Sequence, residues 1–219
     1  MISVIIPTRN RPADLLSVLN CIAAQSLKIT EVIVIDSSDY FSPISKSATW
    51  DYFLQHHHVS VRSAAVQRNI GMNFISNDCE FLCFLDDDVQ PNTFYASQLI
   101  SGINRLDAVG ISGIALNPLK NETMRRVPKG FYGTIQRVFG LDSMQDGKLL
   151  SSGVNIPVRI YAGEIQEVDW LIGCSIWNYK AISDLRFEPD FRGQSLCEDV
   201  IFSIRAKERG RLFVDPNLH

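Results

Sequence analysis

The alternation of short apolar runs with helical segments is the feature that most constrains the fold of this chain. Helical spacing of apolar residues covers 11–25, 44–55, 64–75 and 91–105, and Pro91 is expected at the first position of the last helix. The intervening runs have the length and composition of strands: SVII (3–6), EVIVID (31–36), VSVR (59–62), EFLCFLD (80–86) and AVGISGIAL (108–116). Near-continuous apolar strands joined by helices predict an α/β fold with a Rossmann-like, mostly parallel central sheet flanked by helices.

The second half of the chain is less regular. Residues 117–168 lack clean alternation and predict an irregular insertion, with strand pieces around 154–160 and 165–170. CSIWNYKAI (174–182) and EDVIFSIRAKERG (198–210) predict helices, and RLFVDPNLH at the end predicts a strand and a loop. We therefore expect one domain over 1–219, with halves 1–116 and 117–219, and a domain boundary or truncation near the last residue.

Composition excludes several classes of protein. The chain has 219 residues, of which 46% are hydrophobic, so one sizeable core can form. A net charge of −3 argues against a nucleic-acid partner, which requires a basic surface. Five dispersed cysteines without a CxxC pair predict reduced intracellular thiols. No apolar run approaches the ~20 residues of a membrane helix, and the start is not a signal peptide. We expect a cytoplasmic protein, with peripheral contact at the inner face of the membrane left open.

Polar clusters follow three of the expected strands. PTRN (7–10) follows the first strand, Asp36 ends the second, and Asp86, Asp87 and Asp88 end the strand that begins at residue 80. In parallel sheets, ligands bind beyond the carboxyl ends of the strands. The sequence therefore predicts a ligand site at this edge of the sheet.

The three adjacent carboxylates need a compensating charge. Two of them ~4 Å apart at a partly screened site would repel by on the order of 4 kcal/mol. In an extended chain Asp86 and Asp88 share a side and Asp87 points away, which suits Mg²⁺ or Mn²⁺ bound together with a phosphate-bearing substrate. The alternative is a solvated turn with acids near the start of the next helix. That explains one aspartate better than three, so we favour the metal.

Other polar residues are ambiguous taken singly. Glu198 and Asp199 open a helix, where acids are ordinary, but Asp199 could be a general base that the positive helix end holds ionised. Arg68 could bind a diphosphate or simply lie on a helix surface. The run HHH (56–58) is expected in a helix-to-strand connection rather than at a metal, because adjacent histidines do not easily converge on one ion.

Two further stretches have alternative interpretations. Residues 125–140 interleave basic and aromatic side chains, which fits an acceptor-binding flap, a membrane-surface patch, or an ordinary insertion that fills a satellite core. We favour the flap slightly. In VDWLIGCS (168–175), Trp170 is either a core residue or, with Gly173, part of a pocket wall.

Together, six stretches resemble family 2 nucleotide-sugar glycosyltransferases of the GT-A fold. They are SVIIPTRNRP, EVIVIDSSD, AAVQRNIGMN, FLDDDV, VDWLIGCS and EDVIFSIRAKERG. Each motif is weak alone, but the ordered set spans nearly the whole chain and is specific. The resemblance implies a GT-A fold in which the irregular region is the acceptor-side insertion.

The resemblance also implies roles for residues. The nucleotide site would comprise Pro7, Thr8, Arg9, Asn10, Asp36, Ser37, Arg68, Asp86 and Asp87. The divalent cation, Mn²⁺ or Mg²⁺, would be held by Asp88, Asp86 and the late histidine His219. Trp170 and Gly173 would border donor and acceptor, and Asp199 would deprotonate the acceptor hydroxyl with Glu198 beside it.

The implied function is inverting, metal-dependent transfer from a nucleotide-sugar donor, usually a UDP-sugar. The acceptor would be a saccharide, lipid-linked or other hydroxyl, in bacterial cell-surface polysaccharide or glycoconjugate synthesis. Ser37 and Ser38 stand where the family frequently has a second acid, a departure that bears on which base and sugar are bound. No Q-x-x-R-W motif follows 198–210 and no membrane helix is expected, so a single addition is favoured over processive synthesis. The alternatives are a sugar-phosphate nucleotidyltransferase, which typically needs a glycine-rich loop that PTRNRP lacks, and a non-catalytic nucleotide-sugar-binding domain.

Overall fold

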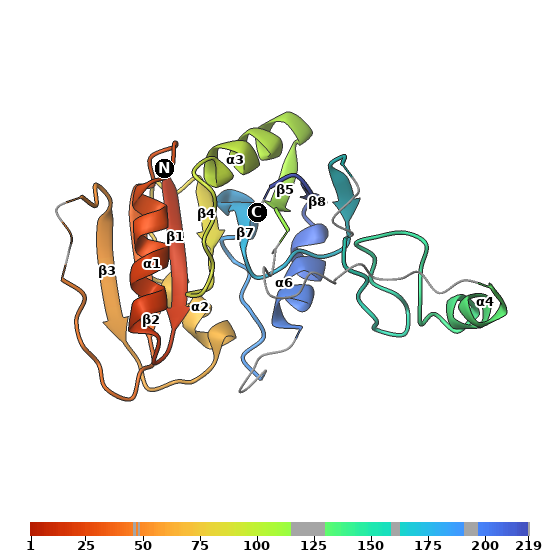
Figure 1. The fold of residues 1–219 in the computed structure, drawn as a ribbon, viewed down its shortest axis with the longest axis horizontal. Coiled ribbons are helices and arrows are strands. Elements are labelled where there is room, and N and C mark those ends of the chain that lie inside the picture. The colour runs from red at the N-terminus through yellow and green to blue at the C-terminus, as the bar shows by residue number, and fades with distance from the viewer. Residues whose placement is uncertain (46, 48, 115–129, 159–162, 191–196, 219) are drawn as a thin grey trace.

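A computed structural model describes residues 1–45, 47, 49–114, 130–158, 163–190 and 197–218. Within these residues eight strands form one sheet in the order β3-β2-β1-β4-β7-β5-β8-β6 (Figure 1). The strands are β1 (Ile2–Thr8), β2 (Glu31–Asp36), β3 (Phe53–His58), β4 (Phe81–Phe84), β5 (Ala108–Ser112), β6 (Gln166–Val168), β7 (Ser175–Asn178) and β8 (Arg211–Val214). The helices are α1 (Pro12–Ala23), α2 (Ala64–Met72), α3 (Tyr95–Leu106), α4 (Gly130–Val138), α5 (Tyr179–Ile182) and α6 (Glu198–Lys207).

Two hydrophobic cores cover the two faces of the sheet. Successive side chains of a strand point to opposite faces. Val4 and Ile6 of β1 accordingly join a core with α1 and α3, whereas Ile5 joins a second core with α2, α5 and α6. The residues of β2 and β4 divide between the two cores in the same alternating way. Burial on both faces explains the continuous apolar runs and confirms the expected α/β class.

The order of the strands places a crevice at one edge. The chain passes from β1 to β2 and β3 on one side, and returns through α2 to β4 on the other side of β1. These four strands are parallel, so the carboxyl ends of β1 and β4 lie together where the strand order reverses. Open α/β sheets bind ligands at such a switch point. The clusters after β1, β2 and β4 therefore meet at one edge, as predicted.

The predicted helix over 174–182 is wrong for its first half. Residues 175–178 form strand β7, which lies between β4 and β5 and is antiparallel to both. Ile176 and Trp177 are buried in opposite cores, as a central strand with both faces covered requires. Only Tyr179–Ile182 is helical. Because β6 is also antiparallel to β8, the sheet is mixed rather than uniformly parallel.

The predicted helix over 44–55 and the strand over 59–62 are wrong. Residues 53–58 form the edge strand β3, which pairs in parallel with β2. The segment just before it is fixed against α1, because the Trp50 indole donates to Asn20 Oδ1 at 2.9 Å and the Tyr52 hydroxyl donates to the Leu19 carbonyl at 3.0 Å. These tertiary contacts outweigh the weak local preference for helix.

The three consecutive histidines therefore belong to a strand and not to a connection. The His57 ring stacks on Phe74 with centroids 3.8 Å apart, while His56 and His58 both contact Phe41 with centroids 4.8 Å apart. Alternation along β3 thus sends His57 to the opposite face from its neighbours.

Element boundaries differ from the sequence expectations elsewhere. Helix α3 begins at Tyr95, not Pro91, because the Asn92 side chain accepts the Phe94 amide at 2.9 Å and forms a turn first. Helix α4 was not expected in the irregular region. The strand piece around 165–170 is confirmed as β6, whereas the described part of 154–160 contributes only a bridge between Asn155 and Leu149.

We predict that Gly110→Ala destabilises the protein. Gly110 lies opposite Trp177 in the β5–β7 pair, and a Cβ at residue 110 would stand 2.5 Å from Trp177 Cε3. The indole cannot withdraw easily, because its Nε1 donates to Ser175 Oγ at 2.7 Å and its ring packs edge-on against Phe202. Overpacking of this kind should lower the free energy of unfolding by about 1–3 kcal/mol, as measured by urea denaturation.

The control for this prediction is Ser101→Ala, which changes an exposed position of α3. It should alter stability by no more than about 0.5 kcal/mol. An unchanged denaturation midpoint in Gly110→Ala would contradict the prediction, because it would show that the space between β5 and Trp177 accommodates an added methyl group.

Candidate functional site

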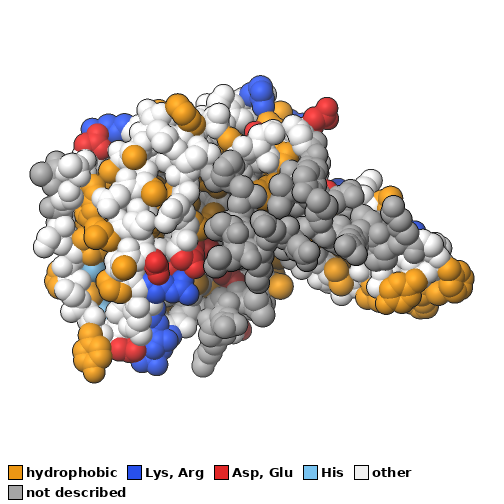
Figure 2. Space-filling model, viewed as in Figure 1, with side chains coloured by type: hydrophobic (Ala, Val, Ile, Leu, Met, Phe, Trp, Pro, Cys, Tyr) orange, Lys and Arg blue, Asp and Glu red, His pale blue; other side chains and the backbone are white. Residues whose placement is uncertain are grey.

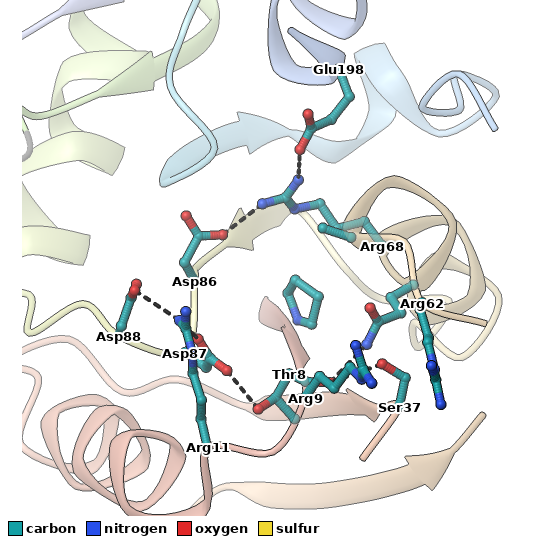
Figure 3. Close-up of a pocket in the computed structure, with 13 residues that line it drawn as sticks. Thr8, Arg9, Arg11, Ser37, Arg62, Arg68, Asp86, Asp87, Asp88 and Glu198 are labelled. Atoms are coloured by element: carbon teal, nitrogen blue, oxygen red, sulfur yellow. Dashed lines mark hydrogen bonds and ion pairs between the residues drawn. The ribbon is translucent and has the colours of Figure 1, made fainter. Parts of the chain in front are cut away.

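A pocket of about 760 Å³ opens at the carboxyl edge of the sheet, between the ends of β1 and β4 and the starts of α2 and α6 (Figure 3). Among the residues that the structure describes, its lining is Pro7, Thr8, Arg9, Arg11, Ser37, Arg62, Ala64, Gln67, Arg68, Asp86, Asp87, Asp88 and Glu198. Most of the predicted nucleotide-site residues therefore line one cavity. Glu198 is the one member of this described lining that comes from beyond residue 88.

The ends of β1 and β4 are joined through Asp87. The Thr8 hydroxyl donates to Asp87 Oδ2 at 2.7 Å, and Arg11 Nη1 donates to Asp87 Oδ1 at 3.0 Å. The same Arg11 nitrogen donates to Asp88 Oδ2 at 2.9 Å. Burial raises the pKa of Asp87, whereas the bonds from Thr8 and Arg11 favour its charged form. Arg11 thus supplies part of the charge compensation that the three carboxylates require.

Arg11 was missed in the sequence, although it is the residue that follows PTRN. Its partners lie 76 and 77 positions away in the chain. Only the parallel arrangement of β1 and β4 brings them together.

Arg68 bridges two carboxylates on the other side of the pocket. Its Nη2 donates to Asp86 Oδ1 at 2.6 Å and its Nη1 donates to Glu198 Oε1 at 2.8 Å (Figure 3). The whole residue is only 2% exposed, and its guanidinium lies over the Phe187 ring. Gly173 is close by, because a Cβ there would lie 3.0 Å from Arg68 Nη2 and 3.5 Å from Asp86 Oδ2.

The three aspartates face different surroundings. Their side chains are 42%, 8% and 55% exposed for Asp86, Asp87 and Asp88 respectively. Asp87 is turned toward β1, so Asp86 and Asp88 are the accessible pair, as expected. The cause differs from the expected strand alternation, because β4 ends at Phe84 and the chain turns at Asp87 and Asp88.

A divalent cation fits this donor set. Within the described parts of the chain, no three His, Cys, Asp or Glu side chains converge on one point. Two accessible carboxylates nevertheless suffice for Mg²⁺ or Mn²⁺, which takes one or two carboxylates and completes its coordination with waters and substrate phosphates. His219, the third candidate ligand, lies outside the described residues.

Asp36 and Ser37, at the end of β2, line two different cavities. Ser37 lines the pocket, whereas Asp36 faces an adjacent hollow of about 410 Å³ whose described lining includes Asn10 and His56. Asp36 Oδ1 accepts the Ser38 amide at 2.7 Å, and its Oδ2 lies 3.2 Å from His56 Nε2. Because His56 Nδ1 accepts a backbone amide at 3.2 Å, Nε2 carries the hydrogen and donates to Asp36.

Asp39 is the shared partner of three polar side chains. Arg9 Nη2 lies 3.2 Å from Asp39 Oδ2, Arg62 Nη2 lies 2.8 Å from Oδ1, and the Asn10 amide donates to Oδ2 at 2.9 Å. The hydrogen bond from Asn10, followed by that from Arg9, lowers the pKa of Asp39. Asn10 is not among the described residues that line the pocket. It instead binds Asp39, the partner of the lining residues Arg9 and Arg62. Neither Asp39 nor Arg62 could be singled out from the sequence, because both are recognisable only through partners remote along the chain.

The acids that open α6 differ in burial. Glu198 is buried against Arg68, while Asp199 is half-buried and is not among the described residues that line the pocket. Burial, and then the charge of Glu198, raise the pKa of Asp199 to about 6, although the Val200 amide donates to its Oδ1 at 2.8 Å. The helix end thus favours the ionised form, as expected, but burial and Glu198 outweigh it. At pH 7 a carboxyl with this pKa is still about nine-tenths ionised, so Asp199 can accept a proton.

Of the two expected wall residues, only Gly173 lies beside the carboxylates. The Trp170 indole donates to the Ile156 carbonyl at 3.3 Å, so its side chain contacts the irregular insertion. Trp170 is not part of the described pocket lining.

Helix α4 carries an exposed apolar surface. Phe131, Tyr132, Val138 and Phe139 are 82%, 67%, 77% and 70% exposed. Hydrophobic side chains gather over α4, at the end of the molecule remote from β3 (Figures 1 and 2). These side chains do not fill a satellite core, so that interpretation of 125–140 is wrong for its described part. In the portion of the chain that the structure describes, no helix is long and apolar enough to cross a membrane.

Comparison with known proteins gives a family and a fold. The family model Glycosyl transferase family 2 matches residues 3–159. Staphylococcus aureus TarS 1–349 is 19% identical with a TM-score of 0.60, over 99% of this chain and 58% of that one. TarS 1–349 in complex with UDP-GlcNAc is 19% identical with a TM-score of 0.57, over 99% and 56%. GalNAc-T7 with UDP, GalNAc and Mn²⁺ is 12% identical with a TM-score of 0.62, over 100% and 43%.

No curated protein sequence matches the chain. The chain spans little more than half of TarS 1–349, so it corresponds to part of that protein. At these identities the solved structures establish a shared fold, which is that of GT-A glycosyltransferases.

Proposed function

Because the chain belongs to glycosyl transferase family 2, we propose that it transfers a sugar from a nucleoside diphosphate donor to an acceptor hydroxyl, with inversion at the anomeric carbon. The observation that carries this proposal is the convergence on one pocket of the carboxylates after β4 and of Glu198, which opens α6 directly before Asp199. A UDP-sugar is the proposed donor, since TarS has been solved with UDP and UDP-GlcNAc and GalNAc-T7 with UDP and GalNAc.

The donor half of the pocket suits a diphosphate. Arg9, Arg11 and Arg62 line it with side chains that are 39–62% exposed, so their guanidinium groups can bind phosphate oxygens. Asp86 and Asp88 would hold a divalent cation, which supplies positive charge against the charge that develops on the leaving diphosphate.

The acceptor half supplies the base. Asp199 would take the proton from the acceptor hydroxyl as its oxygen attacks the anomeric carbon, and the bond to the diphosphate breaks on the opposite face. A single base of this kind, without a covalent nucleophile, gives inversion. A pKa of about 6 suits the task, because a general base works best when its pKa lies just below the working pH.

The two rival functions are less well supported. A sugar-phosphate nucleotidyltransferase typically needs a glycine-rich phosphate loop, and no glycine is among the described residues that line the pocket. The half-buried Asp199, which directly follows the pocket residue Glu198 and has a raised pKa, is more typical of an active site than of a non-catalytic binding domain.

The exposed face of α4 supports a membrane contact. Phe131, Val138 and Phe139 have no hydrogen-bonding group in their side chains, so this face fits the apolar boundary of a lipid surface. Residues 125–141 also contain four basic residues and no acid, whereas the whole chain has a net charge of −3. We propose that α4 lies on an anionic membrane and brings the pocket to a lipid-linked acceptor.

We predict that Asp199→Asn abolishes turnover while nucleotide binding persists. A hydrolysis screen over nucleotide sugars first identifies the donor, since slow donor hydrolysis requires no knowledge of the acceptor. The variant should then turn over about 10²- to 10⁴-fold more slowly, the range supplied by general bases, with UDP affinity by calorimetry unchanged. The matched control is Asp78→Asn, at an exposed loop position.

Unchanged turnover in Asp199→Asn would remove Asp199 from the mechanism. Release of pyrophosphate from a nucleoside triphosphate and a sugar phosphate would instead support the nucleotidyltransferase.

We predict that Mn²⁺ strengthens UDP binding and that Asp88→Ala removes this effect. Calorimetric titrations with and without Mn²⁺ should differ by about tenfold or more in the dissociation constant for the unaltered protein, by analogy with the losses caused by disturbing metal sites. Asp78→Ala should keep the full difference. Equal affinities with and without Mn²⁺ would argue against a cation at Asp88.

We predict that the protein sediments with vesicles that contain anionic lipid and that Phe131→Ser/Phe139→Ser abolishes this binding. The matched control is Phe53→Ser/Phe94→Ser, which removes two exposed rings elsewhere, 62% and 57% exposed in the unaltered chain. Sedimentation of both double variants like the unaltered protein would show that α4 is not the contact. Association of the free protein into dimers through α4, measured by ultracentrifugation, would point to a second copy as its partner.

A further inference from the structure

We infer that Arg68 is a positioning residue that joins the donor side of the pocket to the helix carrying the base, rather than a ligand of the diphosphate. The inference rests on the proposed function and refines it. It follows from the contacts of Arg68, from its burial and from the place of Glu198 in the pocket.

Both terminal nitrogens of Arg68 are already engaged by protein carboxylates. Nη2 donates to Asp86 at 2.6 Å and Nη1 to Glu198 at 2.8 Å, and Nε has no hydrogen-bond partner among the described residues. A guanidinium that is 2% exposed depends on such partners, because a buried charge without them is strongly destabilising. Arg9, Arg11 and Arg62 are far more accessible to a diphosphate.

Among the described residues, Glu198 is the point at which the second half of the chain reaches the pocket. The surroundings of Arg68 strengthen this contact, because the Asn69 side chain donates to the Phe187 carbonyl at 2.8 Å and accepts its amide at 2.7 Å. The Phe187 ring in turn stacks on Phe202 of α6 with centroids 4.2 Å apart. Helix α2 therefore contacts the start of α6 directly through the Arg68–Glu198 ion pair, and it contacts the middle of α6 indirectly through Phe187. Asp199 follows directly after Glu198.

Charge and position act on Asp199 in separable ways. Among the described groups, Glu198 raises the pKa of Asp199 and Arg68 lowers it. Removing the Glu198 charge should therefore make Asp199 easier to ionise, and removing the Arg68 charge should make it harder. Titration of Asp199 without donor therefore measures the effect of Arg68 on the base separately from any contact with phosphate oxygens.

The experiment compares Glu198→Gln, Arg68→Gln and Arg68→Lys, with Glu208→Gln at the exposed end of α6 as control. Donor hydrolysis should fall as the pH is lowered, because the base becomes protonated. The midpoint of this fall should lie at a lower pH in Glu198→Gln than in the unaltered protein, and at a higher pH in Arg68→Gln. Arg68→Lys should keep the profile near that of the unaltered protein, because the charge is retained. Its kcat should still fall about 10- to 100-fold, because an ammonium lacks the fork that reaches both carboxylates. UDP affinity should stay within about threefold in all variants.

Carboxyl ¹³C titration of Asp199 by NMR gives the same comparison without turnover. The titration midpoint should move down in Glu198→Gln and up in Arg68→Gln, and thermal unfolding verifies that each variant is folded. If Arg68→Gln does not fold, Glu198→Gln, which keeps a hydrogen-bonding side chain of the same shape, carries the test.

The outcomes separate this inference from the proposed function. Unmoved midpoints, or a loss of UDP affinity of tenfold or more in Arg68→Lys with a normal Asp199 titration, would overturn the positioning role. Absence of hydrolysis of any nucleotide sugar by the unaltered protein would contradict the proposed function, while shifted NMR midpoints would still establish the link between Arg68 and Asp199.

Discussion

Compensation of carboxylate charge organises the edge of the sheet at which the pocket lies. Five acids, Asp86, Asp87, Asp88, Glu198 and Asp199, stand at or beside one pocket, and two arginines bridge the first four of them in pairs. Arg11 holds the end of β1 to the turn after β4, and Arg68 holds that turn to α6. Each bridge spans elements that are remote in sequence, so the charges that the chemistry needs also help to fix the architecture. The accessible carboxylates are left where a cation and a diphosphate can reach them.

The sequence predicted the parts of the fold in which local pattern and tertiary demand agree. Strands β1, β2 and β4 are mainly apolar because both faces are buried, and the polar residues at their ends meet at one edge because the strands are parallel. Prediction failed where a tertiary contact decided the conformation. Trp50 and Tyr52 form hydrogen bonds to α1, and residues 175–178 are extended because they pair with β4 on one side and β5 on the other. Nothing in the local spacing of those residues reports these contacts.

The same reasoning accounts for the success and failure at the candidate site. Residues at strand ends, such as Thr8 and Asp87, could be placed together from the topology alone. Arg11 and Asp39 could not, because their importance lies in partners that only the fold supplies. Asp199 was identified by the motif, but its pKa was not, because burial and a neighbouring charge outweigh the helix end. Sequence thus indicates which groups are present, and packing determines their ionisation.

The position of β7 has a consequence for how the chain acquires its structure. β4 and β5 are consecutive strands joined through α3, yet they do not pair, because β7 lies between them. The four strands β3, β2, β1 and β4 can assemble from the first 84 residues, but the sheet cannot become continuous until Ser175–Asn178 arrives. Closing contacts over such long separations slows folding. During synthesis the facing edges of β4 and β5 therefore remain unpaired for many residues, a period in which they are open to contact with other chains.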